Sequence, residues 1–383
     1  MRVAVVVRSL KIGGMERVAV NLSEAFADFG HESHLIYFKP KGKAFTPKEN
    51  VILHEMNLDK ILKSSFIGLM SYISTKLLNM IIRGSYFYFN GKFLSPIFQN
   101  ELLNIEKKYG KFDLIVMRGH GTFELVWAYQ DSRVIQTVES VFIREKKWID
   151  KFYIKNLYKN KNIACVSSGV KKKVEEVIDT IGVNVKSIQT IYNPIDLSSI
   201  TKMIEEYTPD INEPYIVSLG RITPNKNIPF LLESYKYARD IFGVKELLII
   251  IGDGSDMQNV KLKIKELNLT KYVKLLGLLE NPFPWLNNAK LFTLPSKAEG
   301  LPTVVIEALS CQTKIVATKS KGGIWDIMTD DLSDYLVDFN PQSFAKKISE
   351  TLAEEKSWDF EKYIKKFSPE SIIDSYIEKY IKN

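Results

Sequence analysis

The chain alternates short, wholly apolar runs with segments in which apolar residues recur every three or four positions. The first run, Arg2–Val7, is continuous, as expected of a parallel strand that is buried on both faces. Two glycines, Gly13 and Gly14, come next, and a stripe with helical spacing follows them: Val18, Leu22, Ala25, Phe26 and Phe29. Gly30 then stands where a glycine commonly ends a helix. The chain therefore opens with a strand, a glycine turn and a helix.

Strand-like runs recur in two series that are separated by turn signals between residues 193 and 214. The first series contains Arg2–Val7, His34–Phe38, Asp113–Met117, Val134–Val138 and Ile163–Val166. The second contains Tyr215–Ser218, Leu247–Ile251, Val273–Leu276, Leu291–Leu294 and Ile315–Ala317. Helical patterns between strands favour parallel sheets covered on both faces. We therefore expect an α/β protein with two doubly wound, Rossmann-like domains, residues 1–195 and 196–383, facing a ligand-binding cleft. The pattern leaves open a return of the last helix to the N-terminal domain.

Composition narrows the class of protein. With 45% hydrophobic and 26% charged residues the chain has the composition of a globular protein. The longest apolar stretch, Ser64–Ile82, is interrupted by Lys76, and the run at the N-terminus is too short for a signal peptide. Cys165 and Cys311 lie far apart in apolar segments, as reduced core thiols do. We expect a cytoplasmic protein without disulfides or spanning helices.

Positive charge is concentrated in the first half of the chain. Residues 1–200 carry 29 Lys and Arg against 19 Asp and Glu, whereas the remainder carries 24 against 26. Residues 60–100 hold five basic and no acidic residues among several aromatics. Residues 141–163 hold seven basic residues: Arg144, Lys146, Lys147, Lys151, Lys155, Lys159 and Lys161. This pattern favours an anionic membrane surface; a solvated basic face is the plainer alternative, and no motif for nucleic acid accompanies it.

The segment 295–309 contains the most specific candidate chemistry. Glu299 and Glu307 stand eight residues apart, and Pro302 suits the first turn of a helix. Glu299 would then precede the helix and Glu307 would lie within it. Backbone N–H groups from Leu301 to Thr303 would face a phosphate at the helix N-terminus. Carboxylates on either side can accept hydrogen bonds from sugar hydroxyls, while the alternative is an ordinary surface loop.

Two further turns follow strands of the second series. Arg221 and Lys226 could converge on a diphosphate and neutralise the charge of a leaving group. Gly252-Asp253-Gly254 would let a nucleotide approach the backbone closely. As a dinucleotide fingerprint this sequence is incomplete, because Met257 occupies the place of the third glycine.

Together these elements resemble the retaining glycosyltransferases of family 4, which have the GT-B fold and include bacterial polysaccharide and lipopolysaccharide enzymes. The resemblance extends over nearly the whole chain. The segments that carry it are Gly13–Arg17, Val166–Ser168 with the lysines after it, Asn193–Asp196, Gly220-Arg221, Lys226-Asn227, Gly252–Gly254, Pro295-Ser296, Glu299 to Glu307 and Gly322-Gly323.

The resemblance implies roles for individual residues. Arg221 and Lys226 would grip the donor diphosphate, Glu307 would accept from the ribose hydroxyls, and Glu299 would hold the transferred sugar. The Gly13-Gly14 loop would let backbone approach donor phosphate and acceptor. His120 lies in a glycine-flanked turn after a strand and would contact the donor sugar, although a lone histidine is more often structural. No metal-ligand pattern accompanies these residues, so we expect activity without a metal ion or other cofactor.

The resulting expectation is transfer of a hexose or N-acetylhexosamine, with retention, from a nucleotide sugar (UDP favoured) to a lipid-linked oligosaccharide or lipopolysaccharide acceptor. The reaction would take place at the inner face of the cytoplasmic membrane, with the acceptor held by the N-terminal domain. A GT-B nucleotide-sugar epimerase is an alternative that would need further acids and histidines in the cleft. A nicotinamide dehydrogenase would need the missing glycine. A non-catalytic, membrane-associated sugar-binding scaffold is the alternative outside catalysis.

Overall fold

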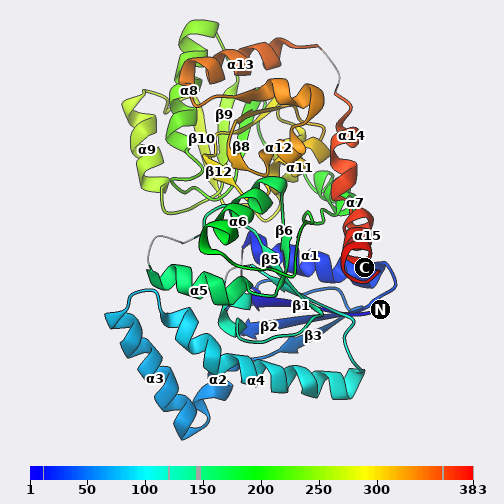
Figure 1. Cartoon of the computed structure of the whole chain (residues 1–383). Helices are drawn as coiled ribbons and strands as arrows, with labels where there is room; N and C mark the ends of the chain where they lie inside the picture. Colours follow the sequence, from blue (N-terminus) through cyan, green and yellow to red (C-terminus); the bar gives the residue numbers. More distant parts are fainter. Residues whose placement is uncertain (12, 120, 144–147, 356–357, 383) are drawn as a thin grey trace. The chain divides into compact units, whose positions relative to one another are not determined.

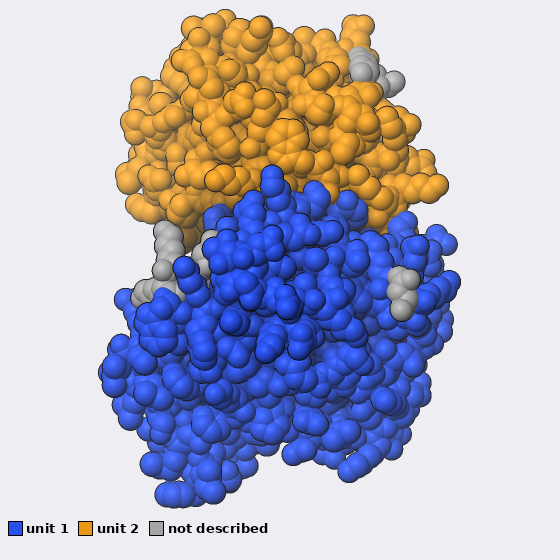
Figure 2. All heavy atoms as spheres, in the orientation of Figure 1, with its two compact units in different colours: residues 1–194, 369–383 blue, residues 195–368 orange. Residues whose placement is uncertain are grey.

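The computed structural model describes residues 1–383 except 12, 120, 144–147, 356–357 and 383, and it divides the chain into two compact units (Figures 1 and 2). Unit 1 contains Met1–Pro194 and Pro369–Asn383, and unit 2 contains Ile195–Ser368. The division lies one residue before the boundary expected from the sequence. The last helix belongs to unit 1.

Unit 1 is built on a seven-stranded parallel sheet with the order β3-β2-β1-β4-β5-β6-β7. The interior strand β1 contributes Val3 to Val6, which are fully buried, because helices cover both faces of the sheet. The strands are β1 (Arg2–Ser9), β2 (Glu32–Lys39), β3 (Val51–Glu55), β4 (Leu114–Arg118), β5 (Val134–Val138), β6 (Asn162–Cys165) and β7 (Ser187–Thr190).

The helices of unit 1 fall into two groups on opposite faces of this sheet (Figure 1). On one face lie α1 (Gly14–Asp28) and α15 (Pro369–Tyr380), and on the other lie α2 (Leu58–Lys63), α3 (Phe66–Ile81) and α4 (Tyr86–Tyr109). The remaining helices are η1 (Phe123–Val126), α5 (Trp148–Tyr158) and α6 (Ser168–Ile181). Helix α1 ends as its sequence predicts, with Gly30 at a φ of 81° just after the cap. Phe29, expected on the buried stripe, is instead 45% exposed because it is the cap residue itself.

Helix α15 is anchored to unit 1 by both apolar and polar contacts. The ring of Tyr376 is fully buried and lies 5.9 Å from that of Phe26 in α1. Lys379 Nζ donates to the carbonyl of Thr190, and Tyr380 Oη donates to that of Ile163. The end of the chain therefore belongs to the core of the unit in which the chain begins.

Unit 2 repeats the plan with a six-stranded parallel sheet of order β10-β9-β8-β11-β13-β15. Its strands are β8 (Tyr215–Leu219), β9 (Leu247–Ile251), β10 (Val273–Gly277), β11 (Leu291–Leu294), β13 (Ile315–Thr318) and β15 (Leu336–Val337), and a separate two-stranded ribbon joins β12 (Ala298–Glu299) to β14 (Lys321–Gly322). The helices are α7 (Leu197–Ile204), α8 (Ile228–Phe242), α9 (Met257–Glu266), α10 (Phe283–Asn287), α11 (Thr303–Ser310), α12 (Ile324–Ile327), η2 (Asp330–Tyr335), α13 (Pro341–Ala353), α14 (Phe360–Ile364) and η3 (Lys365–Phe367).

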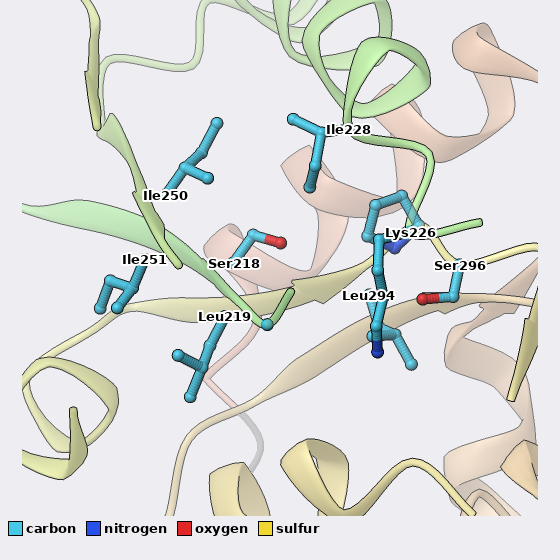
Figure 3. A pocket seen from close by; sticks show the side chains of 10 residues that line it. Ser218, Leu219, Lys226, Ile228, Ile250, Ile251, Leu294 and Ser296 are labelled. Carbon is cyan, nitrogen blue, oxygen red and sulfur yellow. The ribbon is translucent and has the colours of Figure 1, made fainter. Parts of the chain in front are cut away.

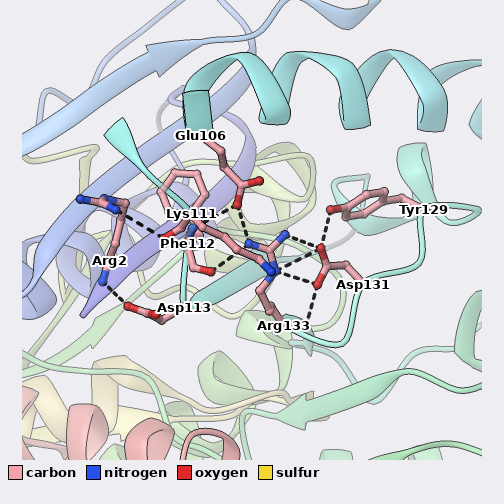
Figure 4. A network of polar contacts seen from close by, with 8 residues as sticks. All are labelled: Arg2, Glu106, Lys111, Phe112, Asp113, Tyr129, Asp131 and Arg133. Carbon is pink, nitrogen blue, oxygen red and sulfur yellow. Dashed lines mark hydrogen bonds and ion pairs between the residues drawn. The ribbon is translucent and has the colours of Figure 1, made fainter. Parts of the chain in front are cut away.

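A polar network ties the amino edge of the unit 1 sheet to the end of α4 (Figure 4). The Arg133 guanidinium donates to Asp131 and Glu106, and Tyr129 Oη donates to Asp131 Oδ2 over 2.8 Å. Burial would raise the pKa of Asp131, but hydrogen bonds from Arg133 and Tyr129 outweigh burial and lower it. This network joins structural elements at the edge of the sheet opposite to the one where ligands bind in such folds.

The two cysteines lie in the core, as expected from their apolar segments. Cys165 and Cys311 are both buried and unpaired, and burial raises the pKa of each thiol to about 12. Among the described residues, no helix is both long and apolar enough to cross a bilayer.

Candidate functional site

Two glycine turns meet at the carboxyl edge of the unit 2 sheet, where β8 and β9 end. Gly220 and Gly252 have φ values of 147° and 134°, which an L side chain rarely adopts. A Cβ on Gly252 would lie 2.0 Å from the carbonyl oxygen of Gly220. Likewise, a Cβ on Gly254 would lie 2.1 Å from the carbonyl oxygen of Ile222. The sequence predicted that a nucleotide could approach the Gly252 turn closely. In the structure, the backbones of the Gly220 and Gly252 turns lie in direct contact with each other.

Lys226 and Glu299 form an ion pair beside these turns. Lys226 Nζ lies 2.7 Å from Glu299 Oε1, and the two side chains are only 20% and 12% exposed. The residues are 73 positions apart, so the pair exists because the fold brings the turn after β8 to the ribbon strand β12. The structure therefore joins two of the residues that the sequence proposes for donor binding.

Backbone and amide contacts hold this pair in place. Asn225 Nδ2 donates to the carbonyl of Ala298, and the Asn225 carbonyl accepts from the N–H of Lys297. On the other side, the N–H of Gly323 donates to the carbonyl of Glu299, as β14 pairs with β12. Asn225 is a positioning residue that the sequence analysis missed. Its place beside Lys226 in a turn is the only sequence signal for it.

A small cavity lies under the pair. Its volume is about 10 Å³, room for about one water molecule, and its wall includes Lys226, Ser218 and Ser296. Figure 3 shows these side chains around the ends of β8, β9 and β11. Ser296 is fully buried, and its hydroxyl has no hydrogen-bond partner among the described residues.

Other predicted residues of unit 2 are placed as follows. Arg221 is exposed at the end of β8 and has no ion-pair or hydrogen-bond partner within the described ranges. Glu307 is half-buried within α11, and Glu299 precedes that helix, as predicted. The prediction of free backbone donors from Leu301 to Thr303 is wrong in part: Pro302 has no N–H, and the N–H of Thr303 donates to the Leu301 carbonyl. The N-terminal end of α11 therefore offers fewer free donors than the sequence suggested.

In unit 1 the two predicted glycines flank the start of α1. Gly13 is the N-cap, with an extended φ of 178°, and Gly14 is the first helical residue. A Cβ on Gly14 would meet no atom within 4 Å, whereas a Cβ on Gly13 would lie 2.3 Å from a carboxylate oxygen of Glu16, so only Gly13 is constrained by its surroundings. His120, the predicted cleft histidine, lies outside the described residues, and no described group of three or more His, Cys, Asp and Glu could hold a metal ion.

The predicted basic surfaces need one correction. Lys161 is 4% exposed, and its ammonium donates to the carbonyl of Tyr129. Burial lowers the pKa of Lys161 to about 8. It is therefore an internal hydrogen-bond donor rather than part of a surface, and residues 144–147 of the same segment lie outside the described residues.

The fold and these paired turns define a two-unit α/β protein of the glycosyltransferase class. Two family models match consecutive parts of the chain: "Glycosyltransferase Family 4" over residues 12–199 and "Glycosyl transferases group 1" over residues 199–367. The chain belongs to this family of glycosyltransferases, as the sequence motifs indicated.

Similar proteins have related descriptions. A Campylobacter jejuni N-acetylgalactosamine-N,N'-diacetylbacillosaminyl-diphospho-undecaprenol 4-alpha-N-acetylgalactosaminyltransferase is 31% identical over 210 residues, which are 54% of this chain and 55% of that protein. The Rhizobium meliloti lipopolysaccharide core biosynthesis glycosyltransferase LpsE is 26% identical over 43% of this chain and 49% of its own length. The chain thus matches about half the length of these relatives. S. aureus TarM shares the GT-B fold, with a TM-score of 0.71, 16% identity and 99% of each chain covered.

Proposed function

We propose that this protein is a retaining, metal-independent glycosyltransferase that moves a hexose or N-acetylhexosamine from a UDP-sugar to a lipid-linked or lipopolysaccharide glycan at the cytoplasmic face of a membrane. The observation that carries the proposal is the Lys226–Glu299 pair beside the Gly220 and Gly252 turns of unit 2. A cation and a carboxylate side by side suit a donor whose diphosphate and sugar are also adjacent. A non-catalytic scaffold would have no use for such a pair.

The proposed reaction depends on stabilising the negative charge of the leaving diphosphate. The bond between the anomeric carbon and the diphosphate breaks while negative charge grows on the leaving phosphate. Lys226 and Arg221 would stabilise that charge, and Lys226 would exchange its carboxylate partner for the phosphate. Glu299 would then be free to accept from sugar hydroxyls. No residue that the structure describes stands out as a nucleophile. We therefore propose that the diphosphate departs from, and the acceptor hydroxyl attacks, the same face of the sugar. The proton of the acceptor hydroxyl would pass to an oxygen of the leaving phosphate.

Thermal unfolding with nucleotides tests the donor. We expect UDP to raise the melting temperature in the presence of EDTA, because a ligand at 100 times its Kd adds about 2.7 kcal/mol to the stability of the folded state. GDP and NAD serve as comparators. The UDP complex of TarM supports the choice of nucleotide. A rise in melting temperature with GDP alone would mean that the donor is a GDP-sugar. A rise that requires Mg²⁺ would contradict the metal-independent proposal. No rise with any nucleotide would favour the non-catalytic scaffold.

The acceptor proposal rests on helix α3. Half of its residues are large hydrophobic side chains that are at least 40% exposed: Phe66, Ile67, Leu69, Met70, Ile73, Leu77, Met80 and Ile81. The surrounding residues 60–100 contain no carboxylate. An exposed apolar helix among basic side chains suits the boundary between anionic headgroups and acyl chains. The diphospho-undecaprenol acceptor in the name of the Campylobacter relative also supports a lipid acceptor.

Substitutions at the tips of α3 should weaken membrane binding. Ile67 and Met80 are 79% and 80% exposed, so Ile67→Asp/Met80→Asp leaves the fold intact. We expect co-sedimentation with vesicles of anionic phospholipid to fall by at least about tenfold, because two apolar side chains no longer enter the bilayer. Binding of the unmodified protein should also weaken as salt shortens the Debye length from about 10 Å at 0.1 M to about 3 Å at 1 M.

A matched control comes from unit 2. Ile241 and Leu278 are 61% and 69% exposed on helix α8 and in the loop after β10. Ile241→Asp/Leu278→Asp should bind vesicles like the unmodified protein. Equal binding by all three proteins would exclude α3 as the membrane contact, and absence of binding at low salt would exclude membrane association of this kind.

A further inference from the structure

A second cavity lies wholly within unit 1, at the carboxyl edge of its sheet. Its volume is about 250 Å³, and three neighbouring strands supply a basic residue to it at their ends: Arg8 from β1, Lys39 from β2 and Arg118 from β4. Lys11, in the connection from β1 to α1, also lines it. We call this cavity the Arg8–Lys39 pocket. None of the residues proposed for donor binding in unit 2 takes part in it.

The charges in this pocket are unbalanced. Four basic side chains share the wall with one carboxylate, Glu16, which already accepts from the hydroxyl of Ser9. Within the described ranges, the side chains of Arg8, Lys11 and Lys39 have no ion-pair or hydrogen-bond partner. Partial burial lowers the pKa of the Lys39 ammonium, and the charges of Arg8 and Lys11 lower it further, against the opposing effect of the Asp59 carboxylate. Bringing cations together in this way stabilises the protein only when an anion lies between them.

Two buried donors also lack an acceptor at this wall. Arg118 is 1% exposed; its terminal nitrogen donates to Glu139 and Asn193, but its Nε has no partner among the described residues. Thr122 is fully buried, and its hydroxyl has no partner either. Buried donors are rarely left without a partner, so these two beside a polar cavity indicate an absent acceptor, although the Arg118 guanidinium also interacts with the phenol of Tyr376.

The Arg8–Lys39 pocket leaves room for the Arg8 guanidinium on one side and lies near helix α3 on the other. Gly121 has a φ of 83°, and a Cβ there would lie 2.7 Å from the guanidinium of Arg8. On the other side, the phenol of Tyr72 in α3 is close enough to Lys39 to affect the pKa of its ammonium. Lys63 and Lys76 lie over the ring of Tyr72, at 3.8 Å and 4.6 Å from its centre. Basic side chains therefore extend from the pocket to α3, with the Asp59 carboxylate of α2 also near Lys39.

We propose that the Arg8–Lys39 pocket binds a phosphate or diphosphate group of the acceptor, which Arg8, Lys39 and the unpartnered donors of Arg118 and Thr122 would contact. The inference rests on the proposed function and assigns a chemical class to its acceptor: a glycan carried on a phosphorylated lipid. A neutral sugar would leave Arg8, Lys11 and Lys39 without an anionic partner in the pocket. The donor diphosphate is the other source of the same chemistry, and the test separates the two.

Inorganic pyrophosphate is the probe, measured by calorimetry at low salt on the full chain. Because pyrophosphate could also occupy the donor site, the starting protein is the Arg221→Ala/Lys226→Ala variant, which lacks those two cations. We expect this variant to bind pyrophosphate, and the further change Arg8→Gln/Lys39→Met to weaken binding by at least about tenfold, because two charge-assisted contacts are lost. Lys107→Met/Lys108→Met, a pair of exposed changes on α4 that removes the same total charge, should leave the affinity unchanged.

Binding of UDP shows whether the pocket takes the phosphate of the acceptor or the diphosphate of the donor. Arg8→Gln/Lys39→Met in the otherwise unmodified chain should bind UDP with unchanged affinity. Weakened UDP binding would assign the pocket to the donor, and pyrophosphate binding that is absent or insensitive to Arg8 and Lys39 would overturn the proposal. Pyrophosphate binding without any UDP binding would instead uphold the pocket while removing the proposed function.

Discussion

Replacing Lys226 with alanine should lower kcat by at least about 100-fold while the protein remains folded. The expected size is that of removing one preorganised group from the place where charge develops in the transition state. In the unliganded protein the Lys226 ammonium neutralises Glu299, 2.7 Å away, and it would neutralise the leaving diphosphate during transfer. The measurement is the initial rate of UDP release from a panel of UDP-hexoses, with a membrane lipid extract as acceptor. Arg221→Ala should show a loss of the same order.

Lys236 provides the matched control for Lys226. It also forms an ion pair, at 2.7 Å from Asp240, but on the exposed face of α8. Lys236→Ala should change neither kcat nor the melting temperature appreciably, since exposed pairs contribute about 0–1 kcal/mol. Lys226→Arg should recover part of the rate, because charge is kept. An unchanged rate in Lys226→Ala would remove the electrostatic account of leaving-group stabilisation.

The sequence predicts the centre of each sheet better than its edges. The strand β9 was found with its exact bounds because it is a purely apolar run buried on both faces. Two edge strands, β3 and β7, were missed, because they are only partly buried and neither has an apolar run longer than three residues. The strand β15 was also missed, since two residues are too short to produce a periodic signal. Burial on both faces makes a strand easiest to find, although the partly buried edge strand β10 was found as well.

The same logic separates the site residues that were found from those that were missed. Lys226 lies in a turn and Glu299 in the short strand β12, and both have a distinctive local sequence, so both were predicted. The positioning role of Asn225 depends on its hydrogen bond to the carbonyl of Ala298, 73 positions away, which no local pattern encodes. Lys161 was misassigned because a charge run does not show which lysine lies inward to meet a carbonyl.

The Arg8–Lys39 pocket was missed for a related reason. Its three basic residues at strand ends, Arg8, Lys39 and Arg118, belong to separate segments of sequence, and only the strand order β2-β1-β4 makes them neighbours. Basic residues that end consecutive parallel strands are a signal that sequence could have supplied, since the carboxyl ends of parallel strands share one edge of the sheet.

Gly252→Ala should lose most UDP binding and destabilise unit 2 by about 3 kcal/mol or more. A φ of 134° costs any residue with a Cβ about 1–3 kcal/mol. The added carbon would also lie 2.0 Å from the Gly220 oxygen, and backbone cannot yield as a side-chain tip does. Relief of the clash requires the turn bearing Gly220 and Arg221 to move, although the N–H of Gly220 is bonded to the Ile251 carbonyl. The readouts are the melting temperature and the UDP affinity.

Gly243→Ala separates the clash from the cost of backbone conformation. Gly243 has a φ of 69° at the end of α8, and a Cβ there would meet nothing within 4 Å. This control should cost only about 1 kcal/mol and leave UDP affinity unchanged, because the left-handed conformation is its only penalty. If Gly252→Ala proved no more damaging than Gly243→Ala, the contact between the two turns would be unimportant for the donor site. A larger loss in Gly252→Ala, with UDP binding lost first, would instead make close approach of the β8 and β9 turns the physical basis of nucleotide recognition.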